Sequence, residues 1–176
     1  TGPAPVFGFL PVLKEAGLAA QPHRVFVDGD FVFMHSPYTN AQAFGGPTLV
    51  AFDVFRVADG KLAEHWDNLQ APPETTVSGR TMTDGPTELT DLGKTSENKA
   101  LVKGFVDDVL LGGEFDKIPE YIAAGPGEYI QHNPGVADGL DGLGAALAAL
   151  AEAGTPMTYT TLHKVLGQAN FVLTMS

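Results

Sequence analysis

Apolar and polar residues are patterned most clearly in Thr48 to Gln70, and the other predicted elements are arranged around this stretch. Two runs rich in Val, Phe and Leu flank Asp59-Gly60. An Asp-Gly pair between such runs predicts a β-hairpin, because both central residues of a type I′ turn need a positive φ and glycine adopts it at no steric cost. Two amphipathic strands alone are marginal in water, so we expect the hairpin to belong to a larger curved antiparallel sheet.

The register of this hairpin decides which side chains share a face. With a two-residue loop at Asp59 and Gly60, the numbers of paired residues sum to 119, and strand alternation sorts the side chains into two faces. One face would hold Asp53, Phe55, Val57, Leu62, Glu64, Trp66 and Asn68, and the other Phe52, Val54, Arg56, Ala63, His65, Asp67 and Leu69. A one-residue bulge at the turn would exchange the partners, so the identity of the inner face stays open.

The residues before the hairpin predict a short helix and two strands. The helix is expected to start near Leu10, because Pro11 is tolerated only in a first turn, and to end at Gly17, a natural residue to follow a helix. Two strands within His23 to His35 flank a second Asp-Gly turn.

The residues from Ala71 to Lys94 are rich in Pro, Thr, Gly and Asp and predict a tail and linker at a domain boundary. Beyond them the pattern predicts three helices, a short strand and a strand pair. The three helices are expected to be capped by Ser96, by Asp116 and near Asp138. The first helix is expected to stop at Gly112-Gly113 and the last at Gly154. The strand covers Glu128 to Pro134, and the strand pair covers Met157 to Ser176 with its turn near Gly167 to Asn170.

An internal repeat links the two halves of the chain. Leu150-Ala151-Glu152-Ala153-Gly154 repeats Leu13-Lys14-Glu15-Ala16-Gly17 at an offset of 137 residues, and the segment Phe171 to Ser176 repeats Phe31 to Ser36 at an offset of 140. We therefore predict that the two copies superpose about an approximate two-fold axis.

The composition of the chain limits the kinds of binding partner that we expect. A net charge of −11 repels phosphate backbones and anionic lipids, so neither nucleic acid nor a membrane is expected as a partner. The longest stretch with few charges, Gly139 to Ala151, is too short to cross a bilayer. The absence of cysteine excludes disulfides and fits a reducing compartment, so we expect a cytoplasmic protein, although the chain begins at Thr1 and a removed signal peptide stays open.

Several of these segments together resemble a known family. They are Phe52-Asp53-Val54-Phe55-Arg56, Asp59-Gly60-Lys61, Glu64-His65-Trp66-Asp67, Gln70, Pro73-Glu74-Thr75 and the turn Gln131-His132-Asn133-Pro134. This set is similar to the SnoaL-like proteins, a family of polyketide cyclases. The resemblance implies an α+β fold in which a cone-shaped, curved antiparallel sheet packs on helices around a pocket. Nuclear transport factor two, ketosteroid isomerase and limonene epoxide hydrolase share this fold.

The resemblance also implies how the repeat is organised. Residues 1–86 would form a SnoaL-like unit without its opening helices, residues 87–95 a linker, and residues 96–176 a second unit without its final hairpin. We expect the tandem repeat to form a pseudo-dimer within the chain, or the chain to form a homodimer. A complete site would then need His132 within about one ligand length of His35 or Asp67.

Four residues are the candidate acid/base groups. The resemblance places His132 at the pocket mouth and His35 in the cavity, whereas His65 and Asp67 stand two residues apart on one strand face and could act as a pair. The alternative for the pair is a salt bridge at the rim, for instance with Arg56. A lone histidine before Asn-Pro is also typical of a turn.

The remaining candidates would bind substrate. They are Phe55, Trp66 and Tyr129, the last as a donor to an enolate oxygen or as an ordinary core residue. Limonene epoxide hydrolase has an acid where this chain has Asn68, which weakens the case for epoxide hydrolysis. The five histidines show no metal-binding spacing, and no phosphate-binding loop or serine elbow occurs, so we expect no cofactor.

The sequence therefore predicts a cofactor-independent enzyme. It would catalyse proton transfer, isomerisation or aldol-type cyclisation of a hydrophobic carbonyl compound. The alternative is a non-catalytic module of the same fold that binds a small molecule or forms a dimer, because one fold hosts many functions.

Overall fold

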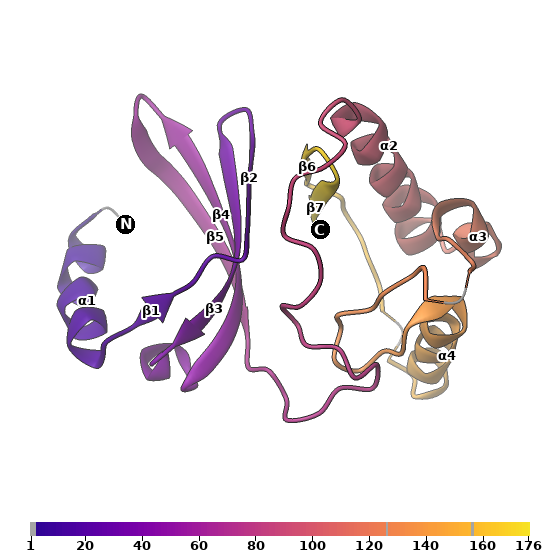
Figure 1. The fold of residues 1–176 in the computed structure, drawn as a ribbon, viewed down its shortest axis with the longest axis horizontal. Coiled ribbons are helices and arrows are strands. Elements are labelled where there is room, and N and C mark those ends of the chain that lie inside the picture. Colours follow the sequence, from indigo (N-terminus) through magenta and orange to yellow (C-terminus); the bar gives the residue numbers. More distant parts are fainter. Residues whose placement is uncertain (1–2, 126, 156) are drawn as a thin grey trace. The chain divides into compact units, whose positions relative to one another are not determined.

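The computed structural model describes residues 3–125, 127–155 and 157–176, with side chains described from residue 7 onward (Figure 1). The chain forms two compact units. Unit 1 comprises residues 1–25 and 29–73, and unit 2 comprises residues 26–28 and 74–176. Compactness does not test the predicted repeat units 1–86 and 96–176 with their linker 87–95, and this division stays a prediction.

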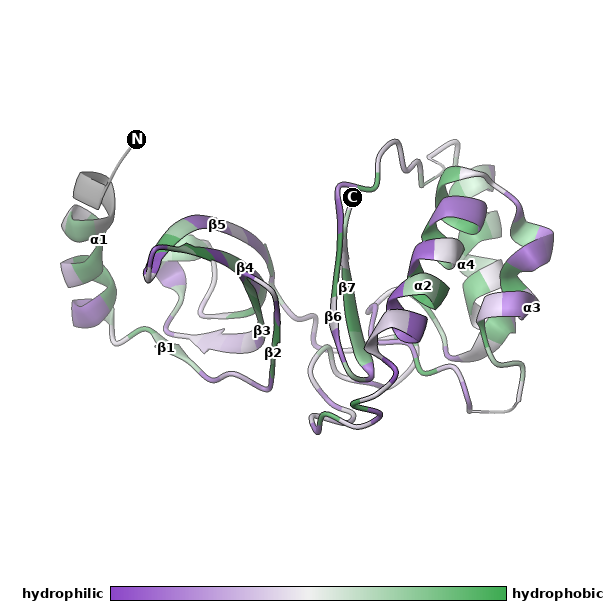
Figure 2. Ribbon diagram, turned by 90° about the horizontal axis from the view of Figure 1, so that it is seen from above, coloured by the Kyte–Doolittle hydropathy of each residue, from purple (hydrophilic) through white to green (hydrophobic). Residues whose placement is uncertain are grey.

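Unit 1 is built on a strongly curled antiparallel sheet, seen as an open half-barrel in Figure 2. The strand order is β1-β3-β4-β5, and β2 also pairs with β3. The elements are α1 (Pro3–Ala16), β1 (Ala19–Ala20), β2 (Arg24–Asp28), β3 (Phe31–Thr39), a 3₁₀ helix (Gln42–Phe44), β4 (Thr48–Ala58) and β5 (Lys61–Gln70). The last three residues of β2, 26–28, are counted with unit 2. The curved antiparallel sheet expected of an α+β fold is thus confirmed.

Helix α1 is longer than its sequence suggests. It begins at Pro3 rather than near Leu10, so Pro11 lies inside the helix, and the prediction that Pro11 must lie in the first turn was wrong. A proline there removes one backbone donor, and the helix continues without that hydrogen bond. The predicted end is confirmed: Gly17 has a φ of +70°, and the Leu18 N–H reaches the carbonyl of Leu13 at 3.0 Å, a Schellman ending.

The organising hairpin forms with the predicted turn and a shifted register. Asp59 and Gly60 have φ values of +51° and +70°, as a type I′ turn requires. A bulge then follows between Arg56 and Val57, and beyond it the paired residue numbers sum to 120 rather than 119. The two predicted faces were therefore wrong beyond the bulge, because an extra residue exchanges the cross-strand partners.

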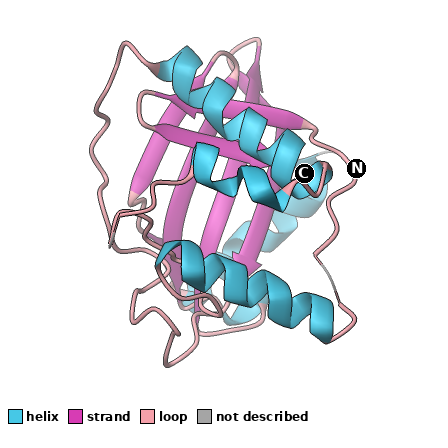
Figure 3. Cartoon of the chain, turned by 90° about the vertical axis from the view of Figure 1, so that its right-hand side faces the viewer, coloured by secondary structure: helices cyan, strands magenta, loops and turns pink. Residues whose placement is uncertain are grey.

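Unit 2 consists of helices and one hairpin (Figure 3). Its elements are α2 (Thr95–Phe105), a π-helix (Val106–Leu111), a 3₁₀ helix (Phe115–Lys117), α3 (Ile118–Tyr121), α4 (Gly139–Glu152), β6 (Lys164–Gln168) and β7 (Phe171–Met175). The predicted turn is confirmed at Ala169 and Asn170, although the strands are shorter than Met157 to Ser176.

Two of the three predicted helix caps were wrong, and the third residue stands at the helix start without a capping bond from its side chain. Lys94 rather than Ser96 stands at the start of α2, and Lys117 rather than Asp116 at the start of α3. Asp138 does precede α4, as expected, but its carboxylate accepts hydrogen bonds from the Gln131 N–H and from Arg80 instead of capping the helix.

The strand predicted for Glu128 to Pro134 was also wrong, since this segment consists of turns. Side chains here bond to nearby backbone: Glu128 accepts from the Gly125 N–H, and the Gln131 side chain accepts from the Asn133 N–H. Such local bonds compete with a strand ladder.

Turn geometry gives a first test of the hairpin. A Cβ on residue 60 would have open space around it, so the cost of Gly60→Ala comes from its positive φ alone. We expect Gly60→Ala to lower the free energy of unfolding by about 1 kcal/mol. Gly8, in α1, also has open space and no positive φ, so Gly8→Ala should stabilise by up to about 1 kcal/mol. Urea unfolding followed by the fluorescence of Trp66, the only tryptophan, measures both, and an equal effect of both changes would contradict this account.

Candidate acid/base site on the curled sheet

The centre of the candidate site is the carboxylate of Asp53, in β4, which is only 1% exposed. It accepts a hydrogen bond from the Tyr38 hydroxyl at 2.8 Å, and its second oxygen lies 3.1 Å from Nε2 of His65. Tyr38 comes from β3 and His65 from β5, so one carboxylate joins three adjacent strands.

The neighbours of Asp53 shift the protonation of Tyr38. Burial raises the pKa of the Tyr38 hydroxyl well above its ordinary value, and the hydrogen bond to Asp53 and the negative charges of Asp53 and Asp67 raise it further. Tyr38 is therefore a neutral donor at ordinary pH, which keeps the Asp53 carboxylate in one orientation.

The imidazole of His65 is held on two sides. Its ring stacks on Phe55 with centroids 4.3 Å apart and planes 3° apart, while Nε2 faces Asp53. When Nε2–H donates to the carboxylate, Nδ1 carries the free lone pair of the neutral ring. The His65 side chain is 44% exposed, so part of the ring is in contact with solvent.

Asp67 lies directly opposite Asp53 in the register of β4 and β5. One potential metal-ligating atom from each of Asp53, His65 and Asp67 lies within 4.8 Å of the others, close enough to hold a small cation. Both Asp53 oxygens already have hydrogen-bond donors, so the hydrogen-bonded arrangement accounts for this cluster. The predicted neighbouring pair His65 and Asp67 therefore shares one face, together with Asp53.

His35 lies on the opposite face of the sheet. It pairs with Phe52 in the register and stacks on that ring at 4.4 Å, and its Nδ1 lies 3.1 Å from Arg24. Because side chains alternate along a strand, this face cannot be the face that carries Asp53 and His65. Trp66 shares the face of His35, whereas Phe55 shares the face of His65, so the bulge separates two residues that were both predicted to bind substrate.

His132 and Tyr129 belong to unit 2. Nδ1 of His132 lies 2.9 Å from the Thr81 carbonyl and 2.8 Å from the carboxylate of Asp84, so this histidine fastens its turn to the segment after unit 1. Burial raises the pKa of Tyr129, whose hydroxyl accepts a hydrogen bond from the Gln131 side chain. The predicted closeness of His132 to His35 or Asp67 concerns residues of different units, and it stays a prediction.

Sequence reasoning missed Asp53 and Tyr38 as site residues. A signal for Asp53 existed: it is a lone carboxylate inside the apolar run Val50-Ala51-Phe52-Asp53-Val54-Phe55, and a buried charge needs partners. Tyr38 gave no such signal, because its partner becomes visible only from the pairing of β3 with β4.

Comparison with known proteins adds no relative. The chain matches no protein-family model, and a search of curated proteins returned no match. Within the described residues, the structure contains no helix with the length and apolar character needed to span a bilayer.

The raised pKa of Tyr38 has a consequence for stability. A phenol whose pKa is raised by folding stabilises the folded state at pH values below its pKa in the unfolded chain, which is about 10. This contribution is lost as the pH rises above that value. We expect the free energy of unfolding of the wild type to fall above about pH 10, and Tyr38→Phe to remove this part of the fall. At pH 7, the substitution should cost about 1.5 to 3 kcal/mol, because Asp53 loses a donor. Trp66 fluorescence during urea unfolding at several pH values measures both effects, and an unchanged pH slope in Tyr38→Phe would contradict the assignment.

Proposed function

We propose that unit 1 is a SnoaL-like, cofactor-independent enzyme that moves protons on a hydrophobic carbonyl compound. The single observation that carries the proposal is the buried Asp53 carboxylate held between Tyr38 and His65. A carboxylate that orients an imidazole and stabilises its protonated form is a recurring device of general acid/base catalysis.

In this proposal each group has its own role. Nδ1 of His65 removes a proton from the carbon beside the carbonyl, and the C–H electron pair becomes the enolate. The imidazolium that forms is stabilised by the negative charge of Asp53, at 3.1 Å. Returning the proton to a different carbon completes an isomerisation. In an aldol-type cyclisation, the enolate carbon attacks a second carbonyl, and His65 gives its proton to the new alkoxide.

The surroundings of His65 favour an apolar substrate. The Phe55 ring covers one side of the imidazole, and a hydrocarbon body near it would lose contact with water. Asp67 lies across from Asp53, and one of its carboxylate oxygens lies within 4.8 Å of a ring nitrogen of His65. The proposed acid/base roles of His35 and His132 would belong to other surfaces, the opposite sheet face and unit 2.

The tandem repeat is part of the proposal, with the two copies forming a pseudo-dimer. Strands β2 and β6, and β3 and β7, begin at positions 140 residues apart, and the Schellman ending of α1 recurs in α4, where the Thr155 N–H reaches the carbonyl of Leu150. Within unit 2 the Val27 N–H donates to the Gln168 side chain, and the Gly167 N–H donates to Asp28. These two bonds involve positions that are 140 residues apart, the same offset as in the sequence repeat.

The second candidate is a non-catalytic module that binds a small molecule or forms a dimer. The contacts of His132 favour a non-catalytic role for unit 2, because both partners of its Nδ1 lie in the segment to which His132 fastens its turn. Unit 2 would then be the structural copy of the pair.

Proton exchange tests the enzyme directly. A panel of hydrophobic ketones and 1,3-diketones in D₂O, followed by NMR, reports the rate at which the hydrogens beside the carbonyl are replaced. We expect His65→Gln to lower the catalysed rate roughly 10²- to 10⁴-fold, and Asp53→Asn to lower it as well.

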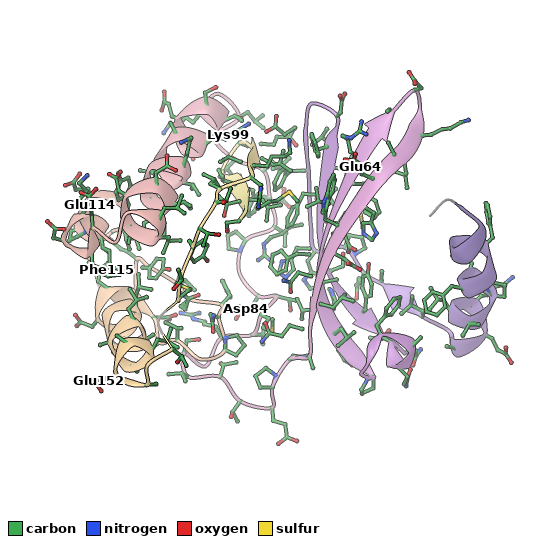
Figure 4. The ribbon with its side chains drawn as sticks, turned by 180° about the vertical axis from the view of Figure 1, so that it is seen from behind. Glu64, Asp84, Lys99, Glu114, Phe115 and Glu152 are labelled. Carbon is green, nitrogen blue, oxygen red and sulfur yellow. The ribbon has the colours of Figure 1, made fainter. Side chains whose placement is uncertain are left out.

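Glu64→Gln is the matched control. Glu64 is the neighbour of His65 on β5 (Figure 4), and it pairs with Arg56 on the opposite face. We expect Glu64→Gln to leave the rate unchanged. Circular dichroism checks that each variant folds. A folded His65→Gln protein with the wild-type rate would exclude His65 as the acid/base group, and the absence of any exchange with the wild type would favour the binding module.

A further inference from the structure

We infer that unit 2 carries a separate binding site for a small amphipathic carboxylate, in a cleft of about 510 Å³ between the α2 to π-helix segment and residues 160–165. This inference stands apart from the proton transfer proposed for unit 1. The volume lies within the range of ordinary small-molecule sites. The cleft is lined on one side by Lys103, Asp107 and Leu111 and on the other by residues that include Leu162, His163 and Lys164.

The helical wall is shaped by the π-helix Val106–Leu111. Its wider turns are marked by the Gly112 N–H, which bonds to the carbonyl of Asp107 at 2.9 Å, five residues back. Val106 and Val109 are buried, while Asp107 and Leu111 line the cleft. Short π-helical segments inside α-helices frequently occur at functional sites, and this one forms a wall of the cleft.

The opposite wall is held at its end rather than along its length. Residues 160–163 form no strand, β6 begins at Lys164, and the His163 N–H donates to the Met175 carbonyl at 2.8 Å. Lys164 also pairs with Met175 in the register of β6 and β7. The wall is therefore anchored where its charged residues lie.

The lining chemistry selects the ligand class. Lys103 and Lys164 bring two positive charges to the cleft against the single negative charge of Asp107, in a chain whose net charge is −11. Leu111, Leu162 and Val165 add apolar surface beside them. A carboxylate attached to a hydrocarbon body matches both features, because the head can pair with an ammonium while the body leaves water.

Lys103 can accept a new partner at small cost. It pairs with Asp107 four residues along the helix, and the Lys103 and Asp107 side chains are 57% and 39% exposed. Exposed pairs of this kind contribute only about 0.2 to 1 kcal/mol. A ligand carboxylate can therefore replace Asp107 as the partner of Lys103, which means that Asp107 competes with the ligand.

Sodium octanoate is the probe, with 1-octanol as the neutral molecule of similar shape. We expect octanoate to bind the full chain saturably, with the amide NMR shifts concentrated in residues 103–111 and 160–165, and 1-octanol to bind more weakly. Lys103→Gln should weaken octanoate binding roughly twofold to fivefold, and Asp107→Asn should strengthen it by a similar factor.

Lys94→Gln provides the control, because it removes the same charge from an exposed lysine of unit 2 that lies outside the cleft and pairs with Asp91. The inference is overturned if octanoate shows no saturable binding at millimolar concentration, if its shifts lie elsewhere, or if Lys94→Gln weakens binding as much as Lys103→Gln. A stronger effect of 1-octanol than of octanoate would also overturn it. None of these results depends on His65 or on the ketone assay.

Discussion

The arrangement of unit 1 depends on one buried charge. The Asp53 carboxylate sits in the middle of β4 almost without contact with water, and burying an unpaired carboxylate would be costly. Donors from the strands on both sides, Tyr38 on β3 and His65 on β5, compensate that cost. The same two bonds that make the burial tolerable also fix the orientation of the imidazole, so the stability of the sheet and the geometry of the proposed site rest on one group.

The bulge between Arg56 and Val57 decides which side chains meet Asp53. In the unbulged register, Glu64 and Trp66 would share its face, and a glutamate and an indole would take the places of the His65 imidazole and of Asp67. One extra residue on β5 brings His65 and Asp67 to this face and sends Trp66 to the face of His35. A local irregularity of the backbone thus selects the chemistry of the whole sheet face.

Much of the fold was predictable, because local chemistry determines it. The Asp59-Gly60 turn and the ending of α1 at Gly17 follow from backbone preferences that act within a few residues. The turn at Ala169 and Asn170 does not, because Ala169 adopts a φ of +58°, which alanine disfavours. The bulge was not predictable, since it depends on how two strands pack after pairing.

The residues of the candidate site also differ in whether a short stretch of sequence reveals them. His65 and Asp67 could be found as neighbours on one strand, but Asp53 and Tyr38 meet them only through pairings across β3, β4 and β5. The predictions of capping side chains failed for a related reason. Thr95 accepts a hydrogen bond from the Ala169 N–H, and Asp138 accepts one from Gln131, and no short stretch of sequence reveals such distant donors.

The proposed duplication gains its strongest support from contacts that are equivalent in pairs. Asp28 and Gln168 occupy corresponding positions, and each accepts a hydrogen bond from the backbone N–H that precedes the other. Lys99 also bonds to Asp28, and together with the Gly167 N–H it outweighs the effect of burial and lowers the pKa of that carboxyl. Gln168 carries no charge that could attract such a partner. Under the proposed duplication, the correspondence would hold for the backbone and end at the side chains, as it would where Met175 stands at the position of His35. A duplicated unit that keeps its framework while its polar groups diverge can stabilise the pair and leave the chemistry to the other copy.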